Sequence, residues 1–231
     1  MMPEDYFYGE FVNAISTIQQ KLKQIKAFVF DWDGVFNDGR KDIEGHSSFS
    51  EVDSMGINMM RFSYFLLHGS LPVSIIFTGE NNKLARSFAR RENFHAVYSK
   101  AANKTRALEH ACNAYSFKQE EVLFVFDDVL DFSVAAAAGV RCMIGRSANA
   151  LLKKFATEKG LVDYITKHNG SNNAIREITE LVMLLHNNFD ATIEYRMHNS
   201  DTYENYLHLR KEITTTFFII GQQSITEETA L

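Results

Sequence analysis

AFVFDWDGV, residues 27–35, is an apolar and β-prone run that ends in two carboxylates followed at once by a glycine. Side chains alternate along a strand, so Asp31 and Asp33 would point the same way, and Gly34 permits the sharp bend that turns both toward one small volume. Two carboxylates this close repel each other unless a divalent cation lies between them or one carboxyl keeps its proton. The stretch therefore predicts a strand that ends at a site for chemistry, although turns by themselves also favour Asp and Gly.

Two later apolar runs also end at polar residues. The run SIIFTG ends in Thr78 and Gly79, and the run VLFVFDD ends in Asp127 and Asp128. Between them, Lys104 stands where a helical pattern begins. In open α/β sheets, ligands bind at the carboxyl ends of the strands, so we expect these side chains to meet at one edge. Taken singly, each has an ordinary explanation as a strand-end hydroxyl, a solvated lysine or a helix-capping pair.

The pattern along the chain predicts an α/β fold. Short apolar runs alternate with amphipathic stretches, as at residues 83–92 and 102–115, which is typical of βαβ units with a parallel sheet. We expect a three-layer, doubly wound, Rossmann-like sheet, with a small β-hairpin flap at residues 36–50, where Asn-Asp-Gly and Glu-Gly turn signals occur. Residues 5–22 carry an apolar stripe at helical spacing and predict an N-terminal helix.

We expect one domain over residues 1–187, followed by a long C-terminal tail over residues 188–231. Within the tail, residues 203–210 have a pattern that predicts a short helix, and residues 214–220 are apolar and β-prone. An apolar, β-prone run is a liability when it is exposed, so we expect the tail to pack on the core or on a neighbouring subunit.

The composition is that of an ordinary globular protein, with 231 residues of which 45% are hydrophobic and 23% are charged. The formal net charge of −5 gives no reason to expect nucleic-acid binding, which usually needs a basic face. Two cysteines cannot build a disulfide framework. We find neither a secretory signal nor a segment long enough to span a membrane, so we expect no membrane partner and a cytoplasmic location.

The polar motifs, in this order and spacing, resemble those of the haloacid dehalogenase (HAD) superfamily of phosphatases. The matching points are Asp31-x-Asp33-Gly34, Thr78-Gly79, Lys104 and Asp127-Asp128. Within the superfamily, the chain is most similar to the small capless branch typified by 3-deoxy-manno-octulosonate-8-phosphate phosphatase, roughly over residues 25–187. The resemblance implies a phosphoric monoester hydrolase that uses Mg²⁺ and acts on a small phosphate ester, a sugar or sugar-acid phosphate.

The resemblance also implies the role of each catalytic side chain. Asp31 would attack phosphorus and form an aspartyl-phosphate, while Asp33 would protonate the leaving oxygen and later take a proton from water. Thr78 and Lys104 would bind the transferring phosphoryl group and neutralise its charge.

The implied magnesium site is built from oxygen ligands, which Mg²⁺ prefers. Its members are Asp31, the backbone carbonyl of Asp33, Asp127, and Asp128 or Asp131, which would orient the ligand shell. The implied substrate-binding positions are Asp53, Ser54, Asn58, Gly79 and Glu80.

Several of these positions depart from the branch. Glu80 and Asn58 stand where sugar-acid phosphatases of this kind usually carry Arg, and Ser54 stands in place of Gly. Because an Arg fork is the natural partner of a substrate carboxylate, we expect altered substrate specificity. Phe126 replaces the Gly that normally precedes the aspartate pair, which adds bulk beside the expected metal ligand.

Three functions remain open from the sequence. The first is the phosphatase, and the second is a catalytically weak or inactive HAD-like protein that acts as an oligomeric binding module. The intact catalytic positions count against the second. The third is a phosphotransferase or mutase, which is disfavoured because an open, capless site admits water to the intermediate.

In the resembling family, neighbouring subunits of a tetramer cover the open site, so we expect a homo-oligomer, with the flap near the interface.

Overall fold

Nine strands form a single sheet in the computed structural model, which describes residues 3–228. Their order is β1-β7-β6-β5-β2-β3-β4-β8-β9, with β1 and β9 antiparallel to their neighbours and the other pairs parallel. The strands are β1 (Glu10–Phe11), β2 (Ala27–Asp31), β3 (Val73–Phe77), β4 (Ala96–Ser99), β5 (Val122–Phe126), β6 (Val140–Met143), β7 (Tyr164–Ile165), β8 (Thr216–Ile220) and β9 (Ile225–Glu228).

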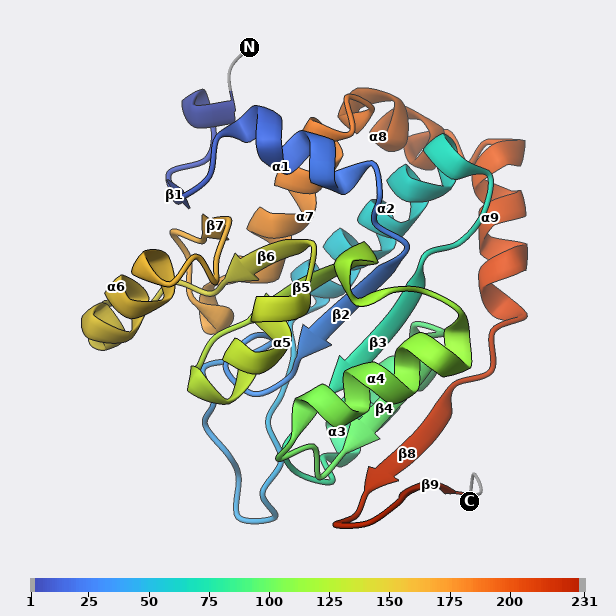
Figure 1. Ribbon diagram of the computed structural model, residues 1–231. Helices are drawn as coiled ribbons and strands as arrows, with labels where there is room; N and C mark the ends of the chain where they lie inside the picture. Colours follow the sequence, from blue (N-terminus) through green and yellow to red (C-terminus); the bar gives the residue numbers. More distant parts are fainter. Residues whose placement is uncertain (1–2, 229–231) are drawn as a thin grey trace.

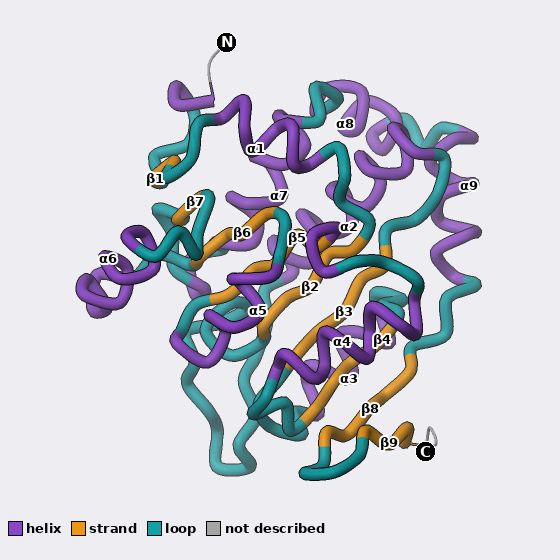
Figure 2. Tube along the Cα trace, viewed as in Figure 1, coloured by secondary structure: helices purple, strands orange, loops and turns teal. Residues whose placement is uncertain are grey.

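Helices cover both faces of the sheet (Figures 1 and 2). They are α1 (Ile15–Leu22), α2 (Glu51–His68), α3 (Lys83–Arg91), α4 (Lys104–Tyr115), α5 (Phe132–Ala137), α6 (Ala150–Glu158), α7 (Ala174–Leu185), α8 (Phe189–Met197) and α9 (Asp201–Lys211). One apolar cluster joins α1, α2, α3 and α7 to the sheet, and a second joins α4, α5 and α6 to the opposite face. The predicted three-layer α/β fold is confirmed. Among residues 3–228, no helix is both long enough and apolar enough to cross a membrane.

The central strand β2 is buried along its whole length because helices cover both faces of the sheet. Its aromatic residues Phe28 and Phe30 belong to one apolar cluster, and its smaller residues Ala27 and Val29 belong to the other. Strands β3 and β5 pair with β2 in parallel, one on each side. The three strands therefore end at the same edge of the sheet. Each of the predicted strand-end motifs begins where one of these strands ends.

The N-terminal segment does not form the predicted continuous helix over residues 5–22. Only its second half is helical, as α1, and residues 10–11 instead pair with β7 as strand β1. Gly9 lies so close to β7 that a side chain there would collide with Tyr164. Pairing with the sheet edge thus takes the place of the first helical turns.

Residues 36–50 form an irregular loop, so the predicted β-hairpin flap is wrong in its secondary structure. The Asp42 carboxylate closes a tight turn at the tip by accepting hydrogen bonds from two backbone N–H groups. At the base, the side-chain oxygen of Asn37 accepts from the Gly34 N–H and its nitrogen donates to the Ser48 carbonyl. Side chains therefore satisfy backbone groups that a strand ladder would have paired. In Figure 1 the loop extends beyond the ends of β2 and β3.

The C-terminal segment folds onto the same chain. Helices α8 and α9 pack on α2, in an apolar cluster that includes Phe62, Tyr203 and Tyr206. Strand β8 pairs in parallel with β4, and β9 returns antiparallel to β8. The helix and strand predicted over residues 203–210 and 214–220 correspond to α9 and β8. The last three residues of the predicted tail, 229–231, lie outside the described part of the chain.

Candidate active site

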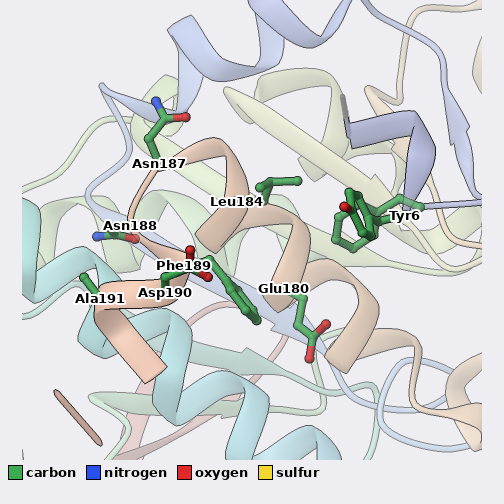
Figure 3. A pocket seen from close by; sticks show the side chains of 9 residues that line it. Tyr6, Glu180, Leu184, Asn187, Asn188, Phe189, Asp190 and Ala191 are labelled. Carbon is green, nitrogen blue, oxygen red and sulfur yellow. The ribbon is translucent and has the colours of Figure 1, made fainter. Parts of the chain in front are cut away.

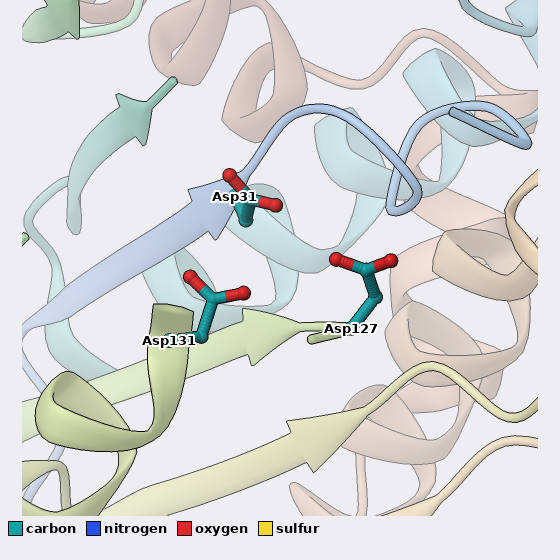
Figure 4. Close-up of side chains that lie close together, drawn as sticks. All are labelled: Asp31, Asp127 and Asp131. Carbon is teal, nitrogen blue, oxygen red and sulfur yellow. The ribbon is translucent and has the colours of Figure 1, made fainter. Parts of the chain in front are cut away.

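Three aspartates from two neighbouring strand ends meet at the carboxyl edge of the sheet. Asp31 is the last residue of β2, Asp127 follows β5, and Asp131 ends a short 3-10 turn after it. One oxygen from each lies within 4.8 Å of the other two, and Figure 4 shows the carboxylates facing a common space. All three residues, which we call the aspartate trio, are buried.

Lys104 reaches the aspartate trio from the first turn of α4. The side chain of Asn103 caps this helix by accepting from a backbone N–H, which fixes where α4 begins. The Lys104 ammonium lies 2.6 Å from Asp31 Oδ1 and 2.5 Å from Asp131 Oδ1. Burial opposes the charge of Lys104, but the two carboxylates outweigh it and raise its pKa, so the side chain is a fixed cation.

The aspartate trio has the electrostatics of a cation site. Burial raises the pKa of Asp31 well above its usual range, and the charges of Asp131 and Asp127 add to the rise, while Lys104 opposes it. Burial also raises the pKa of Asp127 to about 7, against the opposing charge of Arg146. A divalent cation would relieve this cost of ionisation, and an all-oxygen donor set fits a hard cation such as Mg²⁺.

Asp33 stands apart from the trio and is held by the loop over residues 36–50. Its side chain is partly exposed, accepts a hydrogen bond of 2.5 Å from Ser47 Oγ and lies 3.1 Å from Lys41 Nζ. Ser47 Oγ itself accepts from Trp32 Nε1 and Asn82 Nδ2, each at 2.9 Å. Because both incoming bonds are donated to Ser47, its own hydroxyl proton is committed to Asp33.

The aspartate that joins Asp31 and Asp127 is Asp131, whereas Asp128 is exposed. The Asp128 carboxylate accepts from the Val129 N–H and caps the 3-10 turn, which brings Asp131 back toward the strand end. The structure thus separates two residues that the sequence left as alternatives for orienting the metal shell.

Thr78 lies one residue beyond Phe77, which is opposite Asp31 in the pairing of β2 with β3. It is fully buried, and its hydroxyl accepts a long bond of 3.4 Å from the Glu80 N–H. Gly79 and Glu80 are exposed at the same edge, and within residues 3–228 the Glu80 carboxylate has no ion-pair partner. The predicted phosphoryl-binding and substrate-binding residues of this motif therefore border the aspartate trio.

Comparison with known proteins gives a consistent assignment, although no protein-family model matches the chain. A curated relative, 3-deoxy-D-manno-octulosonate 8-phosphate phosphatase from Yersinia pestis, is 26% identical over 169 residues, which cover 71% of this chain and 83% of the relative. A solved structure of the enzyme of that name from Moraxella catarrhalis, which contains magnesium, phosphate and KDO, is 26% identical with a TM-score of 0.65. That match covers 78% of this chain and 98% of the other.

A second solved structure, assigned to HAD subfamily III A and from Legionella pneumophila, has a TM-score of 0.66. It is 21% identical and covers 80% of this chain and 96% of the other, which bears on the fold alone. The chain has the haloacid dehalogenase fold. Its sequence and its structure are both similar to phosphatases of this superfamily, and the similarity supports a phosphoric monoester hydrolase.

Three of the predicted substrate-binding residues have other partners in this haloacid dehalogenase fold. They lie on α2 and are buried. The Asp53 carboxylate accepts from the Arg176 N–H at the start of α7, and Ser54 donates to Glu92 after α3. Asn58 bonds the tail helix α9 through Tyr203, Tyr206 and Arg210. Other elements thus bind these three side chains, and within residues 3–228 none of the three has a hydrogen bond or ion pair to the aspartate trio.

Arg146 is a residue of the site that sequence reasoning missed. It follows β6, and its Nη2 lies 2.8 Å from Asp127 Oδ2 and 3.0 Å from the Gly34 carbonyl oxygen. Gly34 has a φ of 88°, and a Cβ there would overlap both Asp127 and Arg146. A lone arginine between a strand and a helix carries no sequence signal for this contact.

A groove elsewhere on the molecule contains none of the predicted site residues. It lies between the N-terminal segment, α7 and the start of α8, and Figure 3 shows Tyr6, Leu184 and Phe189 along it. Glu180 and Asp190 add two acidic groups. Its lining comes from elements other than the ends of β2, β3 and β5, so it is separate from the candidate active site.

Proposed function

We propose that this chain is a Mg²⁺-dependent phosphatase that hydrolyses a small phosphorylated sugar or sugar acid through an aspartyl-phosphate on Asp31. The observation that carries the proposal is the buried aspartate trio, with Lys104 bound to Asp31 at 2.6 Å, at the carboxyl edge of the sheet. The similarity to phosphatases that act on a sugar-acid phosphate supports the substrate class.

In the first half of the proposed reaction, Asp31 attacks phosphorus as the ester P–O bond breaks. The leaving oxygen takes the proton of Asp33, which Ser47 orients through the hydrogen bond of 2.5 Å. Lys104 and Thr78 face the charge that gathers on the phosphoryl oxygens. The product of this half is the free alcohol and an aspartyl-phosphate.

In the second half, Asp33 takes a proton from water as that water attacks phosphorus. The bond between phosphorus and the Asp31 carboxylate breaks, which releases inorganic phosphate and restores both aspartates to their starting states. Asp31, Asp127 and Asp131 are the side chains that would hold Mg²⁺, which supplies charge neutralisation for the transferring group when it is bound.

The test is release of phosphate from a panel of sugar, sugar-acid and aryl phosphates, with Mg²⁺ and after chelation. We expect release that chelation abolishes and that Asp31→Asn lowers by at least about 1,000-fold, because an amide is not a nucleophile here. Asp38→Asn is the matched control, since this aspartate lies in the neighbouring loop and pairs with Arg40. Cation binding without any phosphate release would favour the binding module instead.

Glu80→Arg tests the substrate class. Glu80 is exposed beside the site and unpaired within the described residues, so an arginine there can reach a substrate carboxylate without breaking an existing contact. We expect turnover of sugar-acid phosphates to rise relative to neutral sugar phosphates. An unchanged ratio would place Glu80 outside the substrate-binding surface.

We further propose that the protein acts in the cytoplasm as a homo-oligomer, with a tetramer favoured. The candidate site has no cap domain among residues 3–228, and Ile43 at the tip of the neighbouring loop is fully exposed, which supports an interface there. Light scattering on the wild type and on Ile43→Ser measures the assembly. We expect the substitution to lower the oligomer mass, and a monomeric wild type would refute this part of the proposal.

A further inference from the structure

Arg146 makes an unusual contact for a residue beside a predicted cation site. Its guanidinium bonds Asp127 Oδ2 at 2.8 Å, so it contacts the carboxylate of one of the residues that would hold the cation. The same Nη2 bonds the Gly34 carbonyl at 3.0 Å, in the segment just after Asp33. Its Nε is buried and has no hydrogen-bond partner. The arginine therefore reaches into the site without being fully satisfied there.

Gly34 leaves the space in which Arg146 and Asp127 form this contact. A Cβ on Gly34 would lie 2.1 Å from Asp127 Oδ2 and 2.2 Å from Arg146 Nη2, so only glycine leaves room for the pair. The position also requires a positive φ of 88°, which glycine adopts freely. The ion pair thus depends on packing and is more than a chance approach of two surface side chains.

Two basic side chains share the three carboxylates of the site. Lys104 bonds Asp31 and Asp131, while Arg146 bonds Asp127. Three carboxylates and two cations leave one negative charge if all are ionised. A divalent cation that binds Asp31 and Asp127 would place two positive charges next to the guanidinium, and in a buried setting this repulsion is weakly screened.

We propose that Arg146 is an internal counter-ion of the cation site. It neutralises the charge of Asp127 while no divalent cation is bound, and its ion pair with Asp127 must break when the cation binds. The inference rests on the proposed function, because it takes the aspartate trio as the cation site. It predicts that the wild type binds cations more weakly than its carboxylates alone would allow. It also predicts that the protein without a cation needs Arg146 for stability.

Isothermal titration calorimetry with MgCl₂ and with MnCl₂ tests the inference on the 231-residue chain. The variants are Arg146→Gln, Arg146→Lys and, as a control for net charge, Lys153→Gln, whose lysine pairs with the distant Glu10. We expect Arg146→Gln to bind the cation at least tenfold more tightly than the wild type. Arg146→Lys should stay closer to the wild type, and Lys153→Gln should remain within twofold.

Thermal unfolding in chelator and in saturating Mg²⁺ gives a second readout that does not depend on activity. Arg146→Gln should unfold at a lower temperature than the wild type in chelator and gain more from Mg²⁺. Equal or weaker cation binding by a folded Arg146→Gln protein would overturn the inference and leave the phosphatase proposal standing. Failure of every protein to bind either cation would overturn both.

Discussion

Two sets of residues were expected to form the site, and they have different environments in the fold. The first set follows the strand ends: Asp31, Asp127 and Lys104 come together at one edge within hydrogen-bond or ligand distance. The second set lies along α2, where Asp53 and Asn58 bond other helices. Parallel strands bring their ends together whatever surrounds them, whereas the contacts of a helix depend on what packs on it.

The C-terminal tail accounts for the surroundings of Asn58 on α2. Asn58 occupies the place of an expected substrate-binding arginine, and here it bonds Tyr206 at 2.9 Å and Arg210 at 2.6 Å from α9. An arginine at that position would meet Arg210 in a buried setting. A change that sequence comparison attributes to substrate specificity is thus also a change in how the tail is fastened to the domain.

The largest effect is expected at the strand-end set. Lys104→Gln should lower kcat for phosphate release by about 100-fold to 1,000-fold, because the proposed mechanism loses a fixed charge beside the transferring phosphoryl group. Steady-state kinetics at saturating Mg²⁺ measures the change, and Lys100→Gln, an exposed lysine before α4, is the control. Equal losses in both variants would show that the site depends on general charge and not on Lys104.

Asp53 should give the next largest effect, on stability and not on rate. Burial raises its pKa to about 7, while an unfolded aspartate ionises near pH 4. Between these values the folded chain keeps a proton that the unfolded chain has released, so folding stability falls as pH rises. One such group accounts for up to about 4 kcal/mol across that window.

Asp53→Asn removes this ionisation and keeps an acceptor for the Arg176 N–H, which bonds Asp53 Oδ1 at 2.9 Å. The variant should match the wild type near pH 4 and become more stable than it as the pH approaches 7. Urea unfolding over a pH series measures the difference, which also cancels the contributions of Asp31 and Asp127. Parallel stability curves for the two proteins would contradict a raised pKa of the buried Asp53 carboxyl.

Asn58→Ala addresses the tail attachment. It removes the amide that bonds Tyr203, Tyr206 and Arg210, and only Tyr206 keeps a bond to the backbone carbonyl of residue 58, so we expect a loss of about 2 to 3 kcal/mol in the free energy of unfolding. The rate of phosphate release per folded molecule should not change. Asn205→Ala, on the exposed side of α9, is the matched control. A selective loss of substrate affinity in Asn58→Ala would return this residue to the substrate site.

Ser47→Ala is expected to have the smallest effect. Asp33, the proposed general acid, loses its orienting hydroxyl, so kcat should fall by about tenfold while KM stays near the wild-type value. Ser47→Thr, which restores a hydroxyl, should recover part of the rate. Ser48→Ala alters an exposed neighbour and should leave kcat unchanged. A change confined to KM would mean that Ser47 contacts substrate instead of orienting Asp33.

Features that depend on residues close together in the sequence were predictable, whereas contacts between distant residues were not. An apolar run that ends in a carboxylate is a local signal, and it located Asp31 and Asp127. The choice between Asp128 and Asp131 depends on the geometry of one 3-10 turn, which two acidic residues in sequence do not reveal. The contact of Arg146 with Gly34 joins residues 112 positions apart, and no local pattern encodes it.

The parallel pairing of β8 with β4 has a consequence for synthesis of the chain. Ala96 is paired with Thr216, so the ribosome must add the whole intervening sequence before the edge of β4 is covered. Until then the nascent protein presents an open, apolar strand edge, a form of exposure that invites association between chains. Chains shortened after residue 187 would keep that edge open permanently and would depend on chaperones to stay dispersed.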